Sequence, residues 1–465
     1  MTATTTNFLG PHVSAIEVEP AGSQPLNAID RVLLAVHKVL RSMGTSGFET
    51  QTLVWTGRRI DAVRLRRAMA RLGRRYPVIT SRLAEPADGP PQWSFQDAAP
   101  HLREVDLRDG DDDAVQRYAA AALSRPRDLS ADDPITFELL RRPDGRDVFL
   151  LQANHALMDY GATAPLIRRI DLLSQDRPHE EDDAAERYSD CIAAHLARFP
   201  RRRRIASALR AIDLRLRILR GDAVRIGRPA PPVEKGGADR PTPYALLSRS
   251  LEPPESRDLQ QRVARTCGFP GVSMAVLAMA FRSLSELAPA DARAGKYVTG
   301  IGLDLGLRNG GEPLFQNACS VVPVGVPAEM LEDRDGLVRA LNQQLRDHLK
   351  RGIDLGIVQL ASLFGRRSAT VNRSARKRLE RGYSLLYASF GSFDSVGESF
   401  CGSPIEHISC AGPAWPPLGL TLLVTQFRGR MHFQATCHAE SVPATLGERF
   451  LDRVLDDLAE FRAVP

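Results

Sequence analysis

His155 and Asp159 are the two side chains in this sequence whose types and spacing are best suited to chemistry. The histidine directly follows the apolar run 148–153, which has the composition of a buried strand. A histidine at a strand end is held rigidly while its ring faces a cleft, and an imidazole can act as a general base near neutral pH. The carboxylate four residues on can fold back and fix the turn. The spacing alone leaves a hydrogen-bonded structural histidine as the alternative interpretation.

Segments with strand and helix periodicity alternate on both sides of this pair. Before it, the pattern predicts a helix entered at 25–40, a strand at 47–55, a helix at 60–77, strands at 78–83 and 91–95, a helix at 113–124, and strands at 134–141 and 147–155. After it, the pattern predicts helices near 165–173, 201–221, 256–267, 273–287, 338–349 and from 445, with strands at 296–308, 317–326, 383–393 and 419–439. The fold class expected from this alternation is α/β (α+β).

The length of the chain and one irregular segment predict two lobes. At 465 residues the chain exceeds the ~250 to 300 residues that one hydrophobic core usually supports. The segment 227–243 has five prolines, three glycines and no periodicity, as expected of a linker or a long crossover. We therefore expect an N-terminal lobe at 1–226, a linker at 227–243 and a C-terminal lobe at 244–465.

Composition excludes several classes of protein. No apolar run approaches the ~18 residues of a membrane-spanning helix, and the first residues lack the pattern of a secretory signal, so a cytoplasmic protein is expected. Six scattered cysteines with no C-x-x-C spacing favour neither disulfides nor a metal site. Of the 62 basic residues 57 are arginine, a ratio that is typical of the codon bias of a GC-rich genome. The net charge of +6 is therefore no indication of a nucleic-acid interface.

The positive charge has one local concentration, at 201–228. Ile205, Leu209, Ile212, Leu216 and Leu219 share one face of a predicted basic amphipathic helix, with arginines around them. Such a helix could face a membrane, an acyl-carrier protein or the phosphates of coenzyme A, and a solvated helix face is the simpler alternative. The segment has no aromatic residues on which bases could stack, so no nucleic-acid partner is expected.

The residues around His155 resemble a known motif. The segment 152–162, QANHALMDYGA, is similar to the H-H-x-x-x-D-G motif of the condensation and CoA-dependent acyltransferase superfamily, which includes nonribosomal peptide condensation domains, chloramphenicol acetyltransferase, wax ester synthases and polyketide-associated acyltransferases. Other segments resemble the family in the family's order. They are PLNAIDRVLL at 25–34, the helix and strand at 58–83, GVSMAVLAMAFRSL at 271–284, LDLGLRNGGEPLFQNACSVVPV at 303–324 and YASFGSFD at 387–394.

The resemblance implies a fold and roles for individual residues. It implies two chloramphenicol-acetyltransferase-like lobes with a shared channel between them, in which His155 is the base. It also implies that Asp159 pairs with Arg308 of the second lobe, and that the backbone N–H of Gly161 stabilises an oxyanion. Asn154 replaces the motif's first histidine in a structural role, and Tyr160 is inserted before the glycine. Further channel candidates are Tyr160 itself, Ser389, Gly391 and Asp394.

The activity implied is acyl transfer from a thioester to an alcohol. The donor would be an acyl-CoA or an acyl-carrier protein, and no metal or permanently bound cofactor is required. Amide formation with an amine acceptor is the close alternative. A non-catalytic condensation-like module that binds a carrier protein or enzyme is the alternative from another class, and Asn154 and the shifted Gly161 are its support. A monomer is expected.

Overall fold

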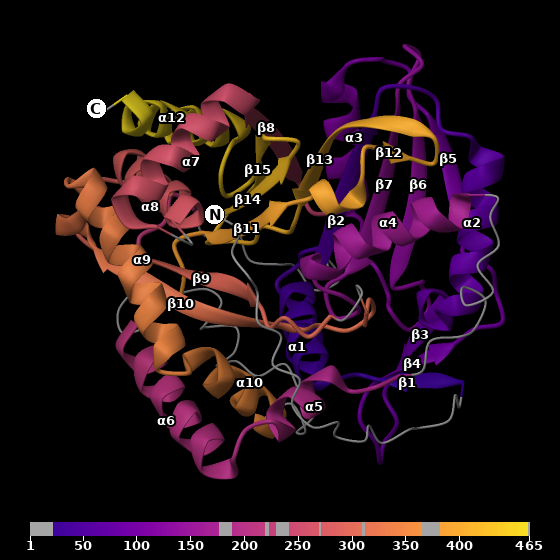
Figure 1. The fold of residues 1–465 in the computed structure, drawn as a ribbon, viewed down its shortest axis with the longest axis horizontal. Helices are drawn as coiled ribbons and strands as arrows, with labels where there is room; N and C mark the ends of the chain where they lie inside the picture. The colour runs from indigo at the N-terminus through magenta and orange to yellow at the C-terminus, as the bar shows by residue number, and fades with distance from the viewer. Residues whose placement is uncertain are drawn as a thin grey trace, which may run out of the picture.

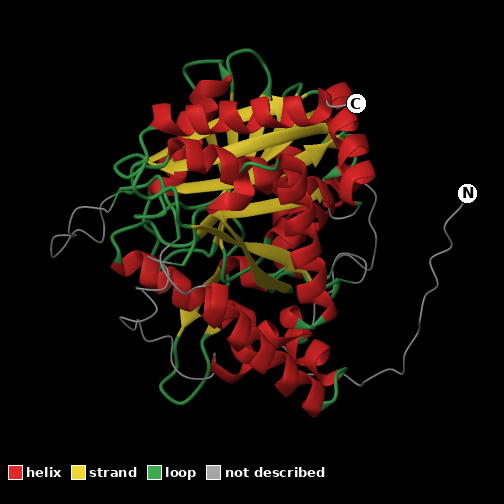
Figure 2. Cartoon of the chain, turned by 90° about the vertical axis from the view of Figure 1, so that its left-hand side faces the viewer, coloured by secondary structure: helices red, strands yellow, loops and turns green. Residues whose placement is uncertain are grey.

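Two α/β lobes lie side by side in the computed structural model, which describes residues 22–175, 188–218, 223–228, 241–268, 271–308, 312–364 and 382–463 (Figure 1). A view turned by 90° shows helices along the outer faces of the strands (Figure 2). The two-lobed α/β architecture predicted from the sequence is confirmed.

The first lobe is built on a six-stranded sheet with the order β12-β13-β2-β7-β6-β5. Its strands are β2 (Glu49–Thr56), β5 (Leu102–Asp106), β6 (Ile135–Arg141), β7 (Asp147–Asn154), β12 (Ser399–Phe400) and β13 (Ser403–Ala411). Both faces are covered by helices, with α2 (Ala62–Arg75) and α4 (Thr163–Ser174) on one side and α3 (Asp112–Ser124) on the other. Alternate residues of β7 therefore enter different cores: Phe149 packs towards α2 and α4, and Leu150 packs towards α3.

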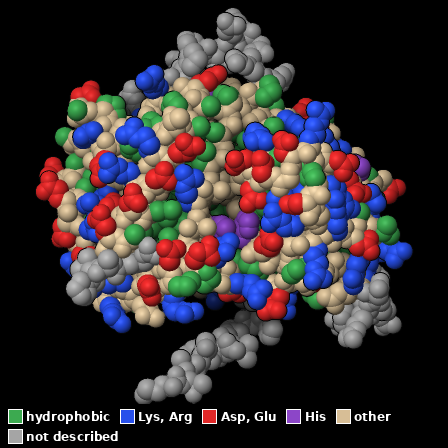
Figure 3. All heavy atoms as spheres, turned by 90° about the horizontal axis from the view of Figure 1, so that it is seen from above, with side chains coloured by type: hydrophobic (Ala, Val, Ile, Leu, Met, Phe, Trp, Pro, Cys, Tyr) green, Lys and Arg blue, Asp and Glu red, His purple; other side chains and the backbone are tan. Residues whose placement is uncertain are grey.

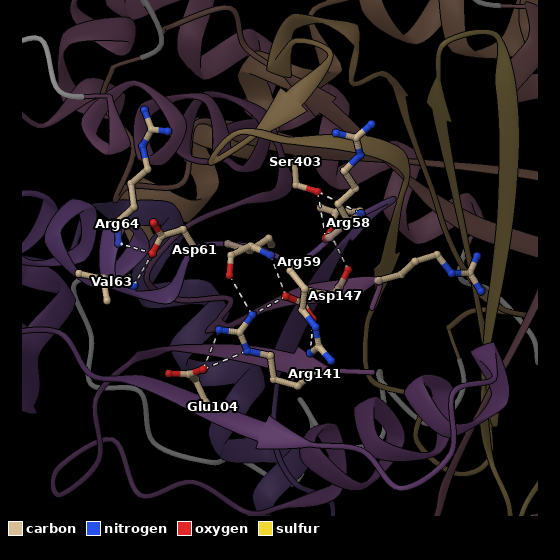
Figure 4. A network of polar contacts seen from close by, with 12 residues as sticks. Arg58, Arg59, Asp61, Val63, Arg64, Glu104, Arg141, Asp147 and Ser403 are labelled. Atoms are coloured by element: carbon tan, nitrogen blue, oxygen red, sulfur yellow. Dashed lines mark hydrogen bonds and ion pairs between the residues drawn. The ribbon is translucent and has the colours of Figure 1, made fainter. Parts of the chain in front are cut away.

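A buried carboxylate fixes β7 at the end opposite His155 (Figure 4). Asp147 accepts hydrogen bonds from the Ile60 backbone N–H at 2.8 Å and from the guanidinium groups of Arg59 at 3.2 Å and Arg141 at 2.5 Å. Arg141 also pairs with Glu104 of the edge strand β5. These contacts set the start of β7, so they also set where its last residue stands seven positions later.

The second lobe carries a four-stranded sheet with the order β11-β14-β15-β8. Its strands are β8 (Tyr244–Leu251), β11 (Leu386–Ser392), β14 (Leu420–Phe427) and β15 (Arg430–His438). The helices packed in this lobe are α7 (Pro253–Cys267), α8 (Gly271–Leu287), α9 (Arg334–Lys350) and α12 (Ala444–Ala463). α8 is buried along most of its length and forms the centre of the largest hydrophobic core.

A two-stranded arm joins the lobes. β9 (Lys296–Asp304) and β10 (Cys319–Pro327) pair antiparallel, and their inner residues pack in the second-lobe core. The connection between them reaches the first lobe, where Leu314 and Phe315 enter its core and the Phe315 carbonyl accepts a hydrogen bond from Gln24 at 2.8 Å. Arg308 and residues 312–318 are thereby brought to the first lobe.

The remaining elements are distributed over both lobes. They are β1 (Ser23–Pro25), α1 (Ala28–Ser42), β3 (Ser81–Ala84), β4 (Gln92–Phe95), α5 (Cys191–Ala197), α6 (Arg201–Ile218), α10 (Ile353–Phe364) and the 3-10 turns Pro77–Thr80, Tyr160–Ala162, Ala328–Leu331 and Asp394–Val396. Three of them, β1, β4 and β3, form a small three-stranded sheet in that order. Where the two sheets meet, the rings of His407 on β13 and His432 on β15 stack 4.3 Å apart. Figure 3 shows histidine side chains near the centre of the upper face.

Three features differ from the sequence expectations. β12 and β13 belong to the first sheet although they lie within 244–465, and α6 packs on α10 and the second-lobe core although it precedes residue 226. The basic segment 201–228 is not one continuous helix: α6 is described from Arg201 to Ile218, and Ala223 forms a bridge with Lys296. The strand expected at 78–83 begins as a 3-10 turn, because Pro77 occupies its first position. Most of the expected linker, 229–240, and Leu219 lie outside the described residues.

No single helix among the described residues is both long and apolar enough to cross a bilayer; α7 and α8 meet that length and composition only as a sharply bent pair.

Candidate active site

His155 stands at the point where β7 leaves the sheet, and contacts from both lobes hold its backbone. Its N–H donates to the Phe48 carbonyl at 2.9 Å, and its carbonyl accepts from Asn317 Nδ2 at 2.8 Å. The Phe48 ring lies 4.7 Å from the imidazole and the Tyr160 ring 5.9 Å, measured between ring centroids. The imidazole is therefore positioned by rigid neighbours on several sides.

The environment of His155 favours the neutral imidazole. Burial lowers its pKa below the ordinary 6.5, while neighbouring polar groups and the Asp159 charge oppose this shift without reversing it. Nδ1 is buried and has no hydrogen-bond partner among the described residues, although the residue as a whole is partly exposed. Because Nδ1 is buried, we expect Nε2 to be the ring nitrogen that meets a substrate, and an unprotonated Nε2 can accept a proton at neutral pH.

Asp159 is bound on both oxygens by groups from the two lobes. Its Oδ1 accepts from Arg308 Nη2 at 2.5 Å and from the Ala162 N–H at 3.3 Å, and its Oδ2 accepts from the Ala318 N–H at 2.8 Å. Arg308 also contacts Asp304 at 3.4 Å. Because these donors occupy both oxygens, Asp159 is a structural anchor of the turn that carries His155.

Gly161 lies against this ion-pair cluster. A Cβ added to Gly161 would stand 2.8 Å from Arg308 Nη1, 3.0 Å from Asp304 Oδ2 and 3.2 Å from Asp159 Oδ1. A side chain at this position would displace the guanidinium, so glycine leaves room for the ion pair of Asp159 and Arg308. A role for its N–H towards an oxyanion stays a prediction.

Asn154 occupies a buried polar network behind His155. Its Nδ2 donates to Glu49 Oε1 at 2.6 Å and to His37 Nδ1 at 2.8 Å, and its Oδ1 accepts from the Ala156 N–H at 3.0 Å. Glu49 is directly opposite Asn154 in the β2–β7 ladder, where side chains of one face are neighbours. Burial lowers the pKa of His37 to about 3, so its neutral ring accepts the hydrogen bond from Asn154. The position therefore makes structural contacts.

A second network reaches His155 from α1 through a residue that the sequence did not single out. Asn317 Nδ2 donates both to the His155 carbonyl and to Asp30 Oδ1, each at 2.8 Å. Asp30 also accepts from the backbone N–H groups of Asn317 and Asn27, both at 2.8 Å. Burial raises the pKa of Asp30 to about 7 despite these donors. The only sequence signal was the capping-box spacing of Asn27 and Asp30, since Asn317 lies 287 residues from Asp30.

Three of the four channel candidates lie at β11, and the fourth, Asp394, does not. The Tyr160 ring packs 4.2 Å from that of Phe390 on β11, and its hydroxyl donates to the Ala411 carbonyl on β13 at 2.7 Å. Ser389 and Gly391 are on β11, where Ser389 is partly exposed and Gly391 is exposed. Asp394, which we expected in the channel, lies elsewhere. Its carboxylate accepts a hydrogen bond from the Arg428 N–H at 2.6 Å and so caps the exposed turn between β14 and β15.

The site contains no recognisable metal centre within the described ranges, where no three His, Cys, Asp or Glu side chains gather around a common point. The six cysteines are unpaired, and burial raises the pKa of the thiols of Cys401, Cys410 and Cys437 to about 12. Those three thiols are therefore poor nucleophiles.

Solved structures share this architecture, although no family model matches the sequence. The trichothecene 15-O-acetyltransferase of Fusarium sporotrichioides matches with a TM-score of 0.70 at 11% identity, over 94% of this chain and 95% of that chain. The first condensation domain of the calcium-dependent antibiotic synthetase, in complex with a substrate analogue, matches with a TM-score of 0.69 at 15% identity, over 96% and 98%. The epimerization domain from the third module of tyrocidine synthetase B gives 0.64 at 14%, over 95% and 96%.

At these identities the likeness concerns the fold. The chain has the two-lobed fold shared by condensation domains and chloramphenicol-acetyltransferase-like acyltransferases, as the resemblance of its sequence predicts.

Proposed function

We propose that the protein is an acyltransferase that moves an acyl group from a thioester to an alcohol and forms an ester. The observation that carries the proposal is a partly exposed histidine whose backbone is held by both lobes at the end of β7, where burial lowers its pKa. A fold shared with an O-acetyltransferase and with condensation domains supports the same class of reaction.

In the proposed reaction the oxygen of the acceptor hydroxyl attacks the thioester carbonyl, while His155 Nε2 accepts the proton of that hydroxyl. A tetrahedral oxyanion forms, and we assign its stabilisation to the Gly161 N–H. The carbon–sulfur bond then breaks, and the leaving thiolate receives the proton from the imidazolium. Products are an ester and a free thiol, so atoms and charges balance with no other reactant.

Asp159 and Arg308 act in this mechanism without touching substrate. Their ion pair holds the turn 155–162 against the second-lobe arm, and the Asp159 charge favours the imidazolium that forms during the reaction. Asn317 holds the His155 carbonyl from the same arm. We therefore class all three as positioning residues.

The donor is either an acyl-CoA or an acyl group on a phosphopantetheinyl carrier, since both present the same thioester arm. An amine acceptor, which would give an amide, uses the same base and is the runner-up. The test is release of free thiol on mixing the protein with both donor types and with panels of alcohols and amines, followed by mass analysis of the product. Thiol release that requires an alcohol and yields an ester supports the proposal, and an amide product supports the runner-up. Wild type and His155→Ala that are equally inert with every donor would instead favour the non-catalytic module.

A further inference from the structure

Helix α6 has two apolar faces, of which only one is used in folding. Ser207, Ala208, Ala211 and Leu214 are buried, and the last two join the second-lobe core. The helix approaches α10 closely where both chains have small residues: a Cβ at Gly352 would stand 2.8 Å from Ser207 Oγ, and one at Gly356 would collide with the Ser207 carbonyl. This contact places α6 in the molecule without help from its other face.

The second face is a stripe of four large aliphatic side chains, which we call the α6 stripe. It consists of Ile205, Leu209, Ile212 and Leu216, which are 49%, 62%, 39% and 58% exposed. The spacing of four, three and four residues aligns them along ~16 Å of one side of the helix, at 1.5 Å per residue. Isolated exposed aliphatics are ordinary, but four in one continuous row mark an interaction surface.

Arginines lie on both sides of this row. At 100° per residue, Arg202 and Arg217 fall on one flank and Arg201 and Arg215 on the other, and all four are exposed. The helix contains seven arginines and a single aspartate, Asp213, which is paired with Arg217 at 2.7 Å. Positive charge bordering an exposed apolar row is the pattern of a helix that lies in a membrane interface.

We propose that the α6 stripe and its flanking arginines form a docking surface for an anionic lipid membrane. α6 lies along the lower left edge of the molecule in Figure 1, so its outer side faces away from both sheets. A flat lipid surface fits such a helix: the aliphatic side chains enter the boundary between headgroups and acyl chains, and the arginines on both flanks reach lipid phosphates. The proposal concerns a surface away from His155 and stands whether or not the protein transfers acyl groups.

The test is binding of the full chain to vesicles of phosphatidylcholine, with and without phosphatidylglycerol, measured by flotation. The wild type should bind the anionic vesicles, bind pure phosphatidylcholine at least about tenfold more weakly, and lose binding as salt is raised. Leu209→Ser with Leu216→Ser should reduce binding at least about tenfold, and so should Arg201→Gln with Arg202→Gln and Arg215→Gln. All these positions are exposed, so the fold should tolerate the changes.

Matched controls replace exposed aliphatic residues elsewhere. Val32→Ser with Val63→Ser removes side chains that are 38% and 55% exposed on α1 and α2, and it should bind like the wild type. Insertion is followed directly with Leu209→Trp against Val63→Trp, because the native Trp55, Trp93 and Trp415 are buried. Only the tryptophan at position 209 should shift its emission to shorter wavelength on anionic vesicles.

Three results would overturn the proposal. One is a wild type that binds no vesicles, including the case in which it binds an acidic carrier protein instead. Another is α6 variants that bind as well as the control. The third is an emission shift equal at positions 63 and 209.

Discussion

The guanidinium of Arg308 meets the carboxylate of Asp159 at the junction of the lobes, with 2.5 Å between Nη2 and Oδ1. Both side chains are only 6% exposed, and 149 residues separate them in the chain. The same carboxylate binds the Ala318 N–H, so the arm of β9 and β10 is attached to the turn that follows His155 at two points. The base and its support therefore come from different lobes.

Removal of Arg308 should damage both stability and turnover. Arg308→Ala leaves a buried carboxylate without its cation, which typically costs about 3 to 5 kcal/mol. We expect a lower melting temperature and a lower kcat with little change in KM, because neither residue contacts substrate. The control is Arg103→Ala, since Arg103 is 48% exposed and pairs with Glu138 at 3.5 Å, a contact worth at most about 1 kcal/mol. Unchanged melting and kinetics in Arg308→Ala would dismiss the anchoring role.

A methyl group at Gly161 should have a similar effect through the same ion pair. Gly161→Ala places a carbon 2.8 Å from Arg308 Nη1, so the guanidinium must move. We expect a loss of activity larger than the loss of stability. Gly302→Ala on β9 is the control, because a Cβ there has no atom within 4 Å. Equal activities of the two variants would show that the packing around Gly161 does not matter.

Asn317 should act through the position of His155. Asn317→Ala removes the side-chain donor of the His155 carbonyl, at a cost of about 1 to 3 kcal/mol for a buried unpaired group, and leaves Asp30 with only its two backbone donors. We expect kcat to fall while KM stays nearly constant. Asn342→Ala is the control: Asn342 is also buried, and it donates to the Cys267 carbonyl in the second lobe. If both variants lose stability and neither loses kcat, Asn317 has a structural role alone.

Asp30 should make stability depend on pH in the direction opposite to most carboxylates. Its folded-state pKa is about 7 against an ordinary 3.8, so between these values the folded state holds a proton that the unfolded state has released. This contribution is fully present below pH 3.8 and is lost as the pH rises through about 7. Denaturant unfolding of Asp30→Asn should show less loss of stability over this interval than the wild type. If the free energy of unfolding falls equally with pH in both proteins, the group that titrates is not Asp30.

The site is partly visible in the sequence. The apolar run before His155 and the spacing to Asp159 indicate a strand end and its turn, and the family resemblance implies the partner Arg308. Asn317 and Glu49 were not identified, because each contacts the site through a fold that brings distant segments together. Asp394 was placed in the channel because the strand pattern around it does not show that its carboxylate caps a neighbouring turn.

The fold, like the site, is only partly predicted by the sequence. The sequence patterns predict no strand at 403–411, yet this segment forms β13 and joins β2 of the first lobe. Periodicity finds the aliphatic face of α6, yet the face that packs is the one with Ser207 and Ala208, because small residues allow close contact with Gly356. Size complementarity between helices leaves little trace in a pattern of polar and apolar residues.

The most direct measurement of the central claim is the initial rate of thiol release by His155→Ala and by wild type, with the most active donor and acceptor. The account predicts a rate lower by about 10² to 10⁴ at neutral pH, the usual contribution of a general base. His348→Ala, at a buried histidine of α9, should keep the wild-type rate. An undiminished rate in folded His155→Ala would contradict the assignment of His155 as the base.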